Sequence, residues 1–125
     1  MKTMLKIATI SGMLAVILGA FGAHVLKGII DPEMLEVYKT GVQYQFYHTF
    51  ALFVTAILMK FSETKVLKWS AYFFVVGLIL FSGSLYLLAV TGIKILGIIT
   101  PFGGMTWIAA WILLFVHCSR STGLK

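Results

Sequence analysis

Four long runs without a charged residue constrain the fold of this chain more than any other feature. The runs are 17 to 22 residues long and cover Ile7–Ala23, Thr40–Met59, Trp69–Val90 and Ile95–Val116. A helix needs about 20 predominantly apolar residues to cross the hydrocarbon core of a bilayer, with about 17 as the lower limit. In the strands of a membrane barrel, apolar and polar residues alternate over about 10 residues. These runs are continuously apolar instead. The sequence therefore predicts an all-α integral membrane four-helix bundle, with spans at about 5–24, 42–60, 67–91 and 98–118.

The composition excludes a water-soluble domain. Apolar residues make up 60% of the 125 residues and charged residues 11%, against about 45–50% and about 25% in soluble domains. A small domain keeps much of its surface exposed, so this surface must face lipid. We predict a single transmembrane domain, residues 1–125. The net charge of +6 does not indicate a nucleic-acid partner, because the basic residues form no stripe or arm.

The basic residues indicate the orientation instead. Seven lie in the first, third and fifth segments outside the runs, namely Lys2, Lys6, Lys60, Lys65, Lys68, Arg120 and Lys125. The other two segments hold three, Lys27, Lys39 and Lys94. Short cytoplasmic loops carry the excess of Lys and Arg. The pattern predicts a bacterial cytoplasmic membrane protein with both termini in the cytoplasm.

The segment between the first two runs is longer than a turn. Asp31, Pro32 and Glu33 are typical of a helix start, as an N-cap, a proline at the first position and an acid in the first turn. Apolar residues follow at helical spacing. We predict a short amphipathic helix, about residues 32–41, which lies at the outer interface and turns into the second span near Gly41.

Small residues recur along one face of three spans. Because lipid tails are as apolar as leucine, close packing of small residues is what can hold membrane helices together. The first run could be mistaken for a signal peptide, but its small residues continue this packing pattern. The predicted packing residues are Ser11, Ala15, Gly19, Ala23, Gly77, Gly83, Gly103 and Ala110.

Polar side chains from all four spans collect in the outer half of the predicted bundle. They are His24, Gln45, His48, Thr49, Ser82, Ser84, Tyr86 and Thr100. An unpaired polar group in hydrocarbon is costly, so these groups should meet each other, water or a ligand. One interpretation is a hydrogen-bonded cluster that fixes helix packing. Another is a pocket for a small ligand or a lipid headgroup. A metal or haem is the least favoured, because two histidines without a nearby Cys, Asp or Glu make a weak site.

Several kinds of chemistry have no residues to support them. No Asp, Glu, Lys or Arg interrupts a run, whereas proton-coupled exporters of this size generally need a membrane carboxylate. There is no set of nucleophile, base and acid, and no phosphate-binding loop. The single cysteine, Cys118, allows no intrachain disulfide. An enzyme is therefore less favoured, and we predict neither a metal nor a cofactor.

The motifs together resemble a known family. Two segments resemble the start of the proteins in domain-of-unknown-function family 423, namely Gly19-Ala20-Phe21-Gly22-Ala23-His24 and Thr40–Thr49. The eukaryotic transmembrane protein 256 is similar to this family. Phe81–Tyr86 and Thr100–Gly104 resemble its later motifs. The resemblance covers nearly the whole chain. It implies a four-helix protein of the bacterial cytoplasmic membrane and no particular activity.

Three hypotheses for function follow. The first is a binding or interaction protein, whose polar cavity in the outer leaflet holds a membrane lipid or small molecule or docks a partner helix. The second is a small-solute transporter or channel, which would have to be a homo-oligomer because four short helices leave little room for a lumen. The third is a structural protein in which the polar cluster serves packing alone.

Overall fold

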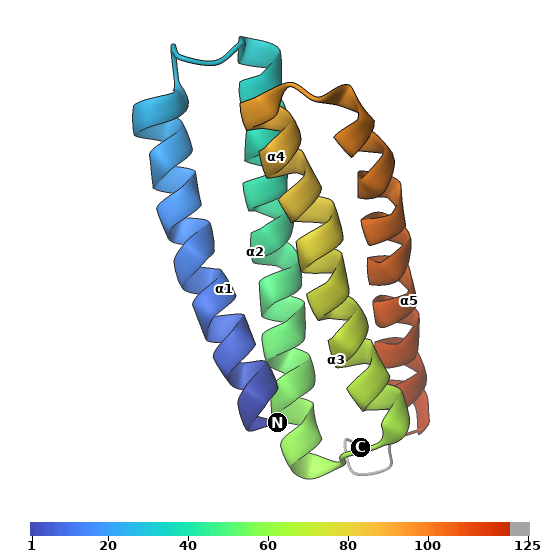
Figure 1. The fold of residues 1–125 in the computed structure, drawn as a ribbon. Helices are drawn as coiled ribbons and strands as arrows, with labels where there is room; N and C mark the ends of the chain where they lie inside the picture. Colours follow the sequence, from blue (N-terminus) through green and yellow to red (C-terminus); the bar gives the residue numbers. More distant parts are fainter. Residues whose placement is uncertain (121–125) are drawn as a thin grey trace.

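The computed structural model describes residues 1–120, which form four helical rods that lie side by side (Figure 1). Lys125, which the charge count included, lies outside the described residues. The first rod is α1 (Lys2–Phe21) with a π-helical turn, Gly22–Leu26. The second is α2 (Pro32–Phe61). The third joins α3 (Lys65–Gly77), a π-helical turn (Leu78–Ser82) and α4 (Gly83–Thr91). The fourth is a 3-10 turn (Lys94–Ile98) with α5 (Ile99–Arg120). The all-α prediction is confirmed for these residues.

Three of the four rods are long and apolar enough to cross a membrane. They are Lys2–Leu26, Lys65–Thr91 and Lys94–Arg120. The remaining rod, α2, is less apolar because it carries buried polar side chains such as Gln45, His48 and Thr55. Polar residues of membrane helices face the interior of the protein, and α2 still exposes apolar side chains such as Phe50 and Val54. The crossing of the membrane by α2 remains a prediction.

The rods alternate in direction. The start of α1, the connection between α2 and α3, and the end of α5 lie at one end of the molecule (Figure 1). The connections from α1 to α2 and from α4 to α5 lie at the other end. The first rod packs mainly against α2, and α5 packs mainly against the third rod. Contacts between α2 and the third rod join the two pairs.

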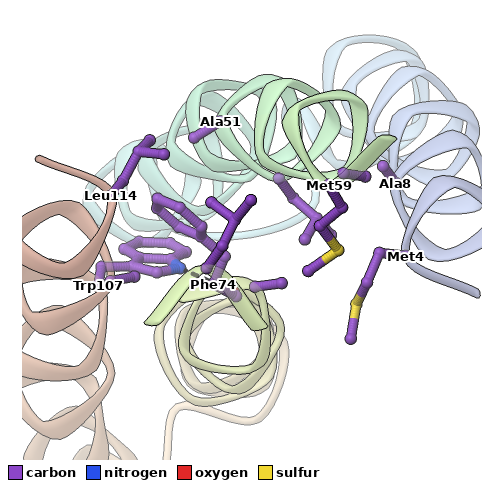
Figure 2. Close-up of a cluster of buried hydrophobic side chains, with 12 residues drawn as sticks. Met4, Ala8, Ala51, Met59, Phe74, Trp107 and Leu114 are labelled. Carbon is purple, nitrogen blue, oxygen red and sulfur yellow. Dashed lines mark hydrogen bonds between the residues drawn. The ribbon is translucent and has the colours of Figure 1, made fainter. Parts of the chain in front are cut away.

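The main apolar core lies between α2, α3 and α5. Phe74 of α3 is fully buried, and the Trp107 ring of α5 lies beside it (Figure 2). The Trp107 indole Nε1 donates a hydrogen bond to the Phe74 carbonyl oxygen at 3.1 Å. The same cluster reaches α1 through Met4 and Ala8, near Met59 of α2 (Figure 2). Side chains therefore fill the space between these rods.

The predicted amphipathic helix is not a separate element. Residues 32–41 are the first turns of α2, which continues without a turn at Gly41. The start itself is as expected, since Asp31 Oδ1 accepts a hydrogen bond from the Glu33 N–H at 3.1 Å. Leu35 and Tyr38 are buried against Leu26 and Ala89. Leu35 and Tyr38 therefore cover the ends of the first rod and of α4. These contacts keep residues 32–41 in line with the rest of α2.

The connection between the third and fourth rods is short and partly helical. The structure has Gly92 with φ of 72°, which ends α4, and a 3-10 turn over Lys94–Ile98 that leads directly into α5 at Ile99. A positive φ favours glycine because it has no Cβ. Pro101 lies in the first turn of α5, where its missing N–H leaves no helical bond unmade.

Candidate functional site

A buried hydrogen-bonded network joins α1, α2 and α4. Tyr86 Oη donates to Gln45 Oε1 at 2.5 Å, and Gln45 Nε2 donates to the Ser11 carbonyl oxygen at 2.9 Å. Ser11 Oγ lies 3.3 Å from the same Nε2 and 2.7 Å from Thr49 Oγ1. Gln45 and Thr49 are one turn apart on α2, so both face α1. The network holds three rods together with side chains from each.

The approach of Tyr86 to α2 depends on Gly41. A Cβ at Gly41 would lie 2.8 Å from the Tyr86 ring, which is closer than real contacts allow. The Gly41 carbonyl oxygen also accepts a hydrogen bond from Ser82 Oγ at 2.8 Å. Two side chains of the third rod therefore meet α2 at this residue. The bare backbone of Gly41 explains why a glycine stands in the middle of a long helix, where it is otherwise unfavourable.

Ser84 and Thr100 form a second, separate contact. Ser84 Oγ lies 2.5 Å from Thr100 Oγ1, which connects α4 to the start of α5. Ser84 Oγ also donates to the Phe81 carbonyl oxygen at 2.9 Å. Both hydroxyls are therefore satisfied within the protein.

His48 lies apart from both of these groups. Its ring stacks on Trp107, with 3.6 Å between ring centroids and 2° between planes. Its Nδ1 lies 2.9 Å from the Tyr44 carbonyl oxygen. Although Gln45 and Thr49 are its neighbours on α2, the His48 side chain faces α5 while theirs face α1.

His24 is exposed in the π-helical turn after α1. Within residues 1–120, no three His, Cys, Asp or Glu side chains are placed to hold a metal ion. The eight predicted polar residues thus lie in separate places: a network at Gln45, contacts at Ser82 and Ser84, a stack at His48, and an exposed His24. Within residues 1–120, no buried side-chain nitrogen or oxygen lacks a hydrogen-bond partner.

Sequence reasoning missed several polar contacts. Tyr38 Oη donates to the Leu18 carbonyl oxygen at 2.5 Å, and Ser70 Oγ donates to the Ala110 carbonyl oxygen at 2.8 Å. Ser11 was assigned to packing alone. The signal that could have identified Ser11 and Ser70 is a hydroxyl on the same face as the small residues. Such a hydroxyl faces a neighbouring helix and needs a partner there.

The small residues divide into close contacts and open positions. A Cβ at Gly77 would lie 2.1 Å from the Trp107 ring, and one at Gly103 would lie 2.5 Å from the Phe81 backbone nitrogen. A Cβ at Gly19 would only just contact Val42, at 3.4 Å. Ser11, Ala15 and Ala110 are buried. By contrast, a Cβ at Gly83 would meet no atom within 4 Å.

The stripe predicted on the first span ends one residue earlier than expected. Ala23 is exposed, and Gly22 is the buried residue, against the Tyr38 ring. Helical residues advance by about 100° each, so residues four apart drift by about 40° per step. After three such steps from Ser11, Ala23 points about 120° away from α2, whereas Gly22 is only about 20° off. Gly22 therefore takes the packing role that we assigned to Ala23.

Two of the open grooves beside α1 lie along its middle and near its end. One, of about 310 Å³, separates α1 from the third rod, and its lining includes Ile10, Leu14, Leu78, Ile79 and Gly83. Ser11, Gln45 and Tyr86 also line this groove. The other, of about 350 Å³, lies between the end of α1 and the start of α2 and includes Lys39 and Gln43. Both have mainly apolar walls.

Comparison with known proteins gives a consistent result. Residues 18–104 match the family model described as "Protein of unknown function (DUF423)". The chain is 48% identical to the UPF0382 membrane protein YwdK of Bacillus subtilis, over 93% of this chain and 95% of that protein. It is 40% identical to the UPF0382 inner membrane protein YgdD of Escherichia coli, over 95% of this chain and 91% of that protein.

It is also 39% identical to the UPF0382 membrane protein SAB0533 of Staphylococcus aureus, over 98% of this chain and 100% of that protein. No solved structure matches the chain. The matched range includes the glycines that pack against Tyr38, Tyr86 and Phe81, as well as Gln45 and Tyr86 of the buried network. The chain is a membrane protein of the DUF423 family.

Proposed function

We propose that the protein is a lipid-binding four-helix bundle of the bacterial cytoplasmic membrane, with both termini in the cytoplasm. The observation that carries the proposal is the groove of about 310 Å³ between α1 and the third rod. Its volume is at the lower end of the range of ligand pockets. In the proposed orientation the groove opens sideways to the bilayer, where the molecules at hand are lipids.

The lining of the groove favours an apolar occupant. Ile10, Leu14 and Ile79 are exposed apolar side chains on its walls. The polar side chains that line it, Ser11, Gln45 and Tyr86, already bond to one another. A headgroup would therefore have to break these bonds to be recognised, whereas an acyl chain needs only apolar contact. We propose an acyl chain of a membrane lipid as the occupant.

Transport is the second function considered. Within one copy, the space between α2, α3 and α5 is filled by Phe74, Trp107 and Leu114. A path for a solute would therefore have to form between copies, as a homo-oligomer. The third function, a purely structural polar cluster, is supported by the complete pairing of the buried polar groups in residues 1–120. It is compatible with the groove, because the paired groups hold its walls in place.

Filling the groove tests the proposal. Gly83→Leu places a side chain in open space on the groove wall, so it should occupy the groove without disturbing the helices. We expect native mass spectrometry of protein released from nanodiscs to show at least about fivefold less retained lipid. Ala20→Leu is the matched control, because Ala20 is exposed on α1 and lines neither groove. Equal lipid retention by both variants and the parent protein would reject the acyl-chain site.

A further inference from the structure

His48 lies deep within α2, on the side away from the acyl-chain groove. It is nine residues after Lys39 and twelve before Lys60. At 1.5 Å per residue these intervals are about 14 and 18 Å along the helix axis. The residue is buried, with 8% of its surface exposed. An ionisable side chain at this depth of a membrane protein is a functional candidate by default.

The hydrogen bond to Tyr44 fixes the tautomer of the neutral ring. A carbonyl oxygen can only accept, so Nδ1 must carry the hydrogen that it donates to the Tyr44 oxygen at 2.9 Å. In the neutral imidazole the other nitrogen then carries a lone pair and no hydrogen. The structure thus leaves Nε2 of His48 as a hydrogen-bond acceptor.

Nε2 of His48 is not completely enclosed by the protein. Among residues 1–120, Nδ1 is the only ring nitrogen of His48 with a hydrogen-bond partner. No buried side-chain nitrogen or oxygen in this part of the chain is left without a partner. An unpartnered Nε2 must therefore lie on the small exposed edge of the ring. The exposed rings nearest to His48 are those of Tyr44 on α2 and Trp111 on α5.

Aromatic rings surround this edge. Trp107 stacks on the face of the imidazole, and Trp111 lies edge-on at 6.0 Å between ring centroids. Trp111 is 45% exposed, and Tyr44 is 38% exposed. The accessible acceptor is thus flanked by flat apolar surfaces that another ring can stack against.

We infer that the exposed edge of His48 binds the hydroxyl group of a neutral lipid-soluble phenol or quinol. The hydroxyl donates its hydrogen to Nε2, and the ring of the ligand packs against Trp111. A charged headgroup does not suit this position, because it would have to enter hydrocarbon about 14 Å below the level of Lys39. The inference does not depend on the acyl-chain groove, which lies between other rods and is lined by other residues.

The ¹⁵N resonances of the histidine rings in nanodiscs test the inference. His48 is assigned as the signal that is lost in His48→Phe. We expect an unprotonated Nε2 in the free protein and a saturable shift of its resonance on addition of 2,3,5-trimethylphenol. The methyl ether of this phenol has the same ring but no hydrogen to donate. We expect it to bind at least about tenfold more weakly, which corresponds to about 1.4 kcal/mol.

A variant away from His48 provides a second test. Trp111→Leu removes the proposed stacking surface while the histidine remains, and we expect it to weaken phenol binding severalfold. Trp69→Leu is the matched control, because Trp69 is exposed at the start of α3, where its ring packs against Tyr72 and Phe73. Its phenol binding should not change.

Three results would overturn the inference. One is a protonated Nε2 in the free protein. Another is a shift that is equal for phenol and methyl ether or that rises linearly without saturation, which would show partitioning into lipid only. The last is a shift of Nε2 without added phenol that disappears on dilution of the protein in lipid. That result would show that a second copy of the chain supplies the donor.

Discussion

The Gln45 side chain links more rods than the other polar side chains described above, because it forms hydrogen bonds to groups on two other rods. Its Oε1 accepts from Tyr86, and its Nε2 donates to Ser11. Removal of this side chain leaves the Tyr86 hydroxyl without a partner and takes one of two partners from the Ser11 hydroxyl, which keeps Thr49. Each unsatisfied group costs about 1–3 kcal/mol, more than the net gain from a typical hydrogen bond. The stability of the folded protein therefore depends strongly on Gln45.

We predict that Gln45→Leu lowers the free energy of unfolding by about 2–4 kcal/mol, because both Tyr86 and Ser11 lose a partner. Denaturant unfolding in detergent micelles, followed by tryptophan fluorescence, measures the change. Gln43→Leu is the control, since Gln43 is exposed and, within residues 1–120, its side chain bonds only to Tyr47 on the same helix. Equal stability of the two variants would mean that the network contributes nothing.

Helical spacing places Gln45, His48 and Thr49 near one face of α2, but the structure keeps only Gln45 and Thr49 together. Gln45 and Thr49 are one turn apart, and this spacing alone places them together. His48 lies between them in sequence but points to α5, where it stacks on Trp107. The rotation of α2 relative to its neighbours decides this division, and rotation depends on contacts between rods that the sequence of one rod does not contain.

At the scale of the helices, glycines set the distance between α5 and the third rod. Gly77 accommodates the Trp107 ring, and Gly103 lies against the backbone at Phe81. Close approach of this kind replaces the hydrophobic effect, which cannot drive helices together in lipid.

We predict that Gly77→Ala and Gly103→Ala each destabilise the protein by about 1–3 kcal/mol, the usual range for overpacking. Gly103→Ala should have the larger effect, because the added carbon meets backbone, which cannot move aside as a ring can. Thermal unfolding in nanodiscs provides the measurement. Gly83→Ala should be neutral or slightly stabilising, since its position is open and alanine favours a helix over glycine by about 1 kcal/mol. A comparable loss in all three variants would contradict the assignment of close contacts.

The positions of the helices could be predicted from the runs of uncharged residues, whereas their irregularities could not. The π-helical turns at Gly22–Leu26 and Leu78–Ser82 have no charge or proline to mark them. The unbroken course of α2 past Gly41 follows from contacts with Tyr86 and Ser82 on another rod. Local sequence therefore determined where a helix forms but did not reveal where it departs from regular α geometry.

At the scale of the whole molecule, the orientation in the membrane is open to a direct test. The only cysteine, Cys118, is exposed near the end of α5, at the same end of the molecule as the start of α1. We predict that a membrane-impermeant maleimide labels Cys118 in inside-out vesicles but not in intact cells, because the positive-inside rule places this end in the cytoplasm.

A matched variant moves the thiol to the other end. Cys118→Ser combined with Glu33→Cys places it in the exposed first turn of α2. This protein should be labelled in intact cells. Labelling of both proteins from the same side would contradict the predicted orientation.

The modest hydropathy of α2 affects how the protein is made. On the proposed topology, this rod must enter the bilayer although two of its buried polar side chains, Gln45 and Thr49, find their partners on other rods. The free energy of inserting a single segment into the bilayer depends on its own side chains, and polar side chains make insertion less favourable. The ribosome supplies α1 first, with Ser11 already in place, and the third rod with Tyr86 later. Stable insertion of α2 then waits for the neighbours that complete its bonds, so the biogenesis of this small protein is a joint event of several helices rather than four independent ones.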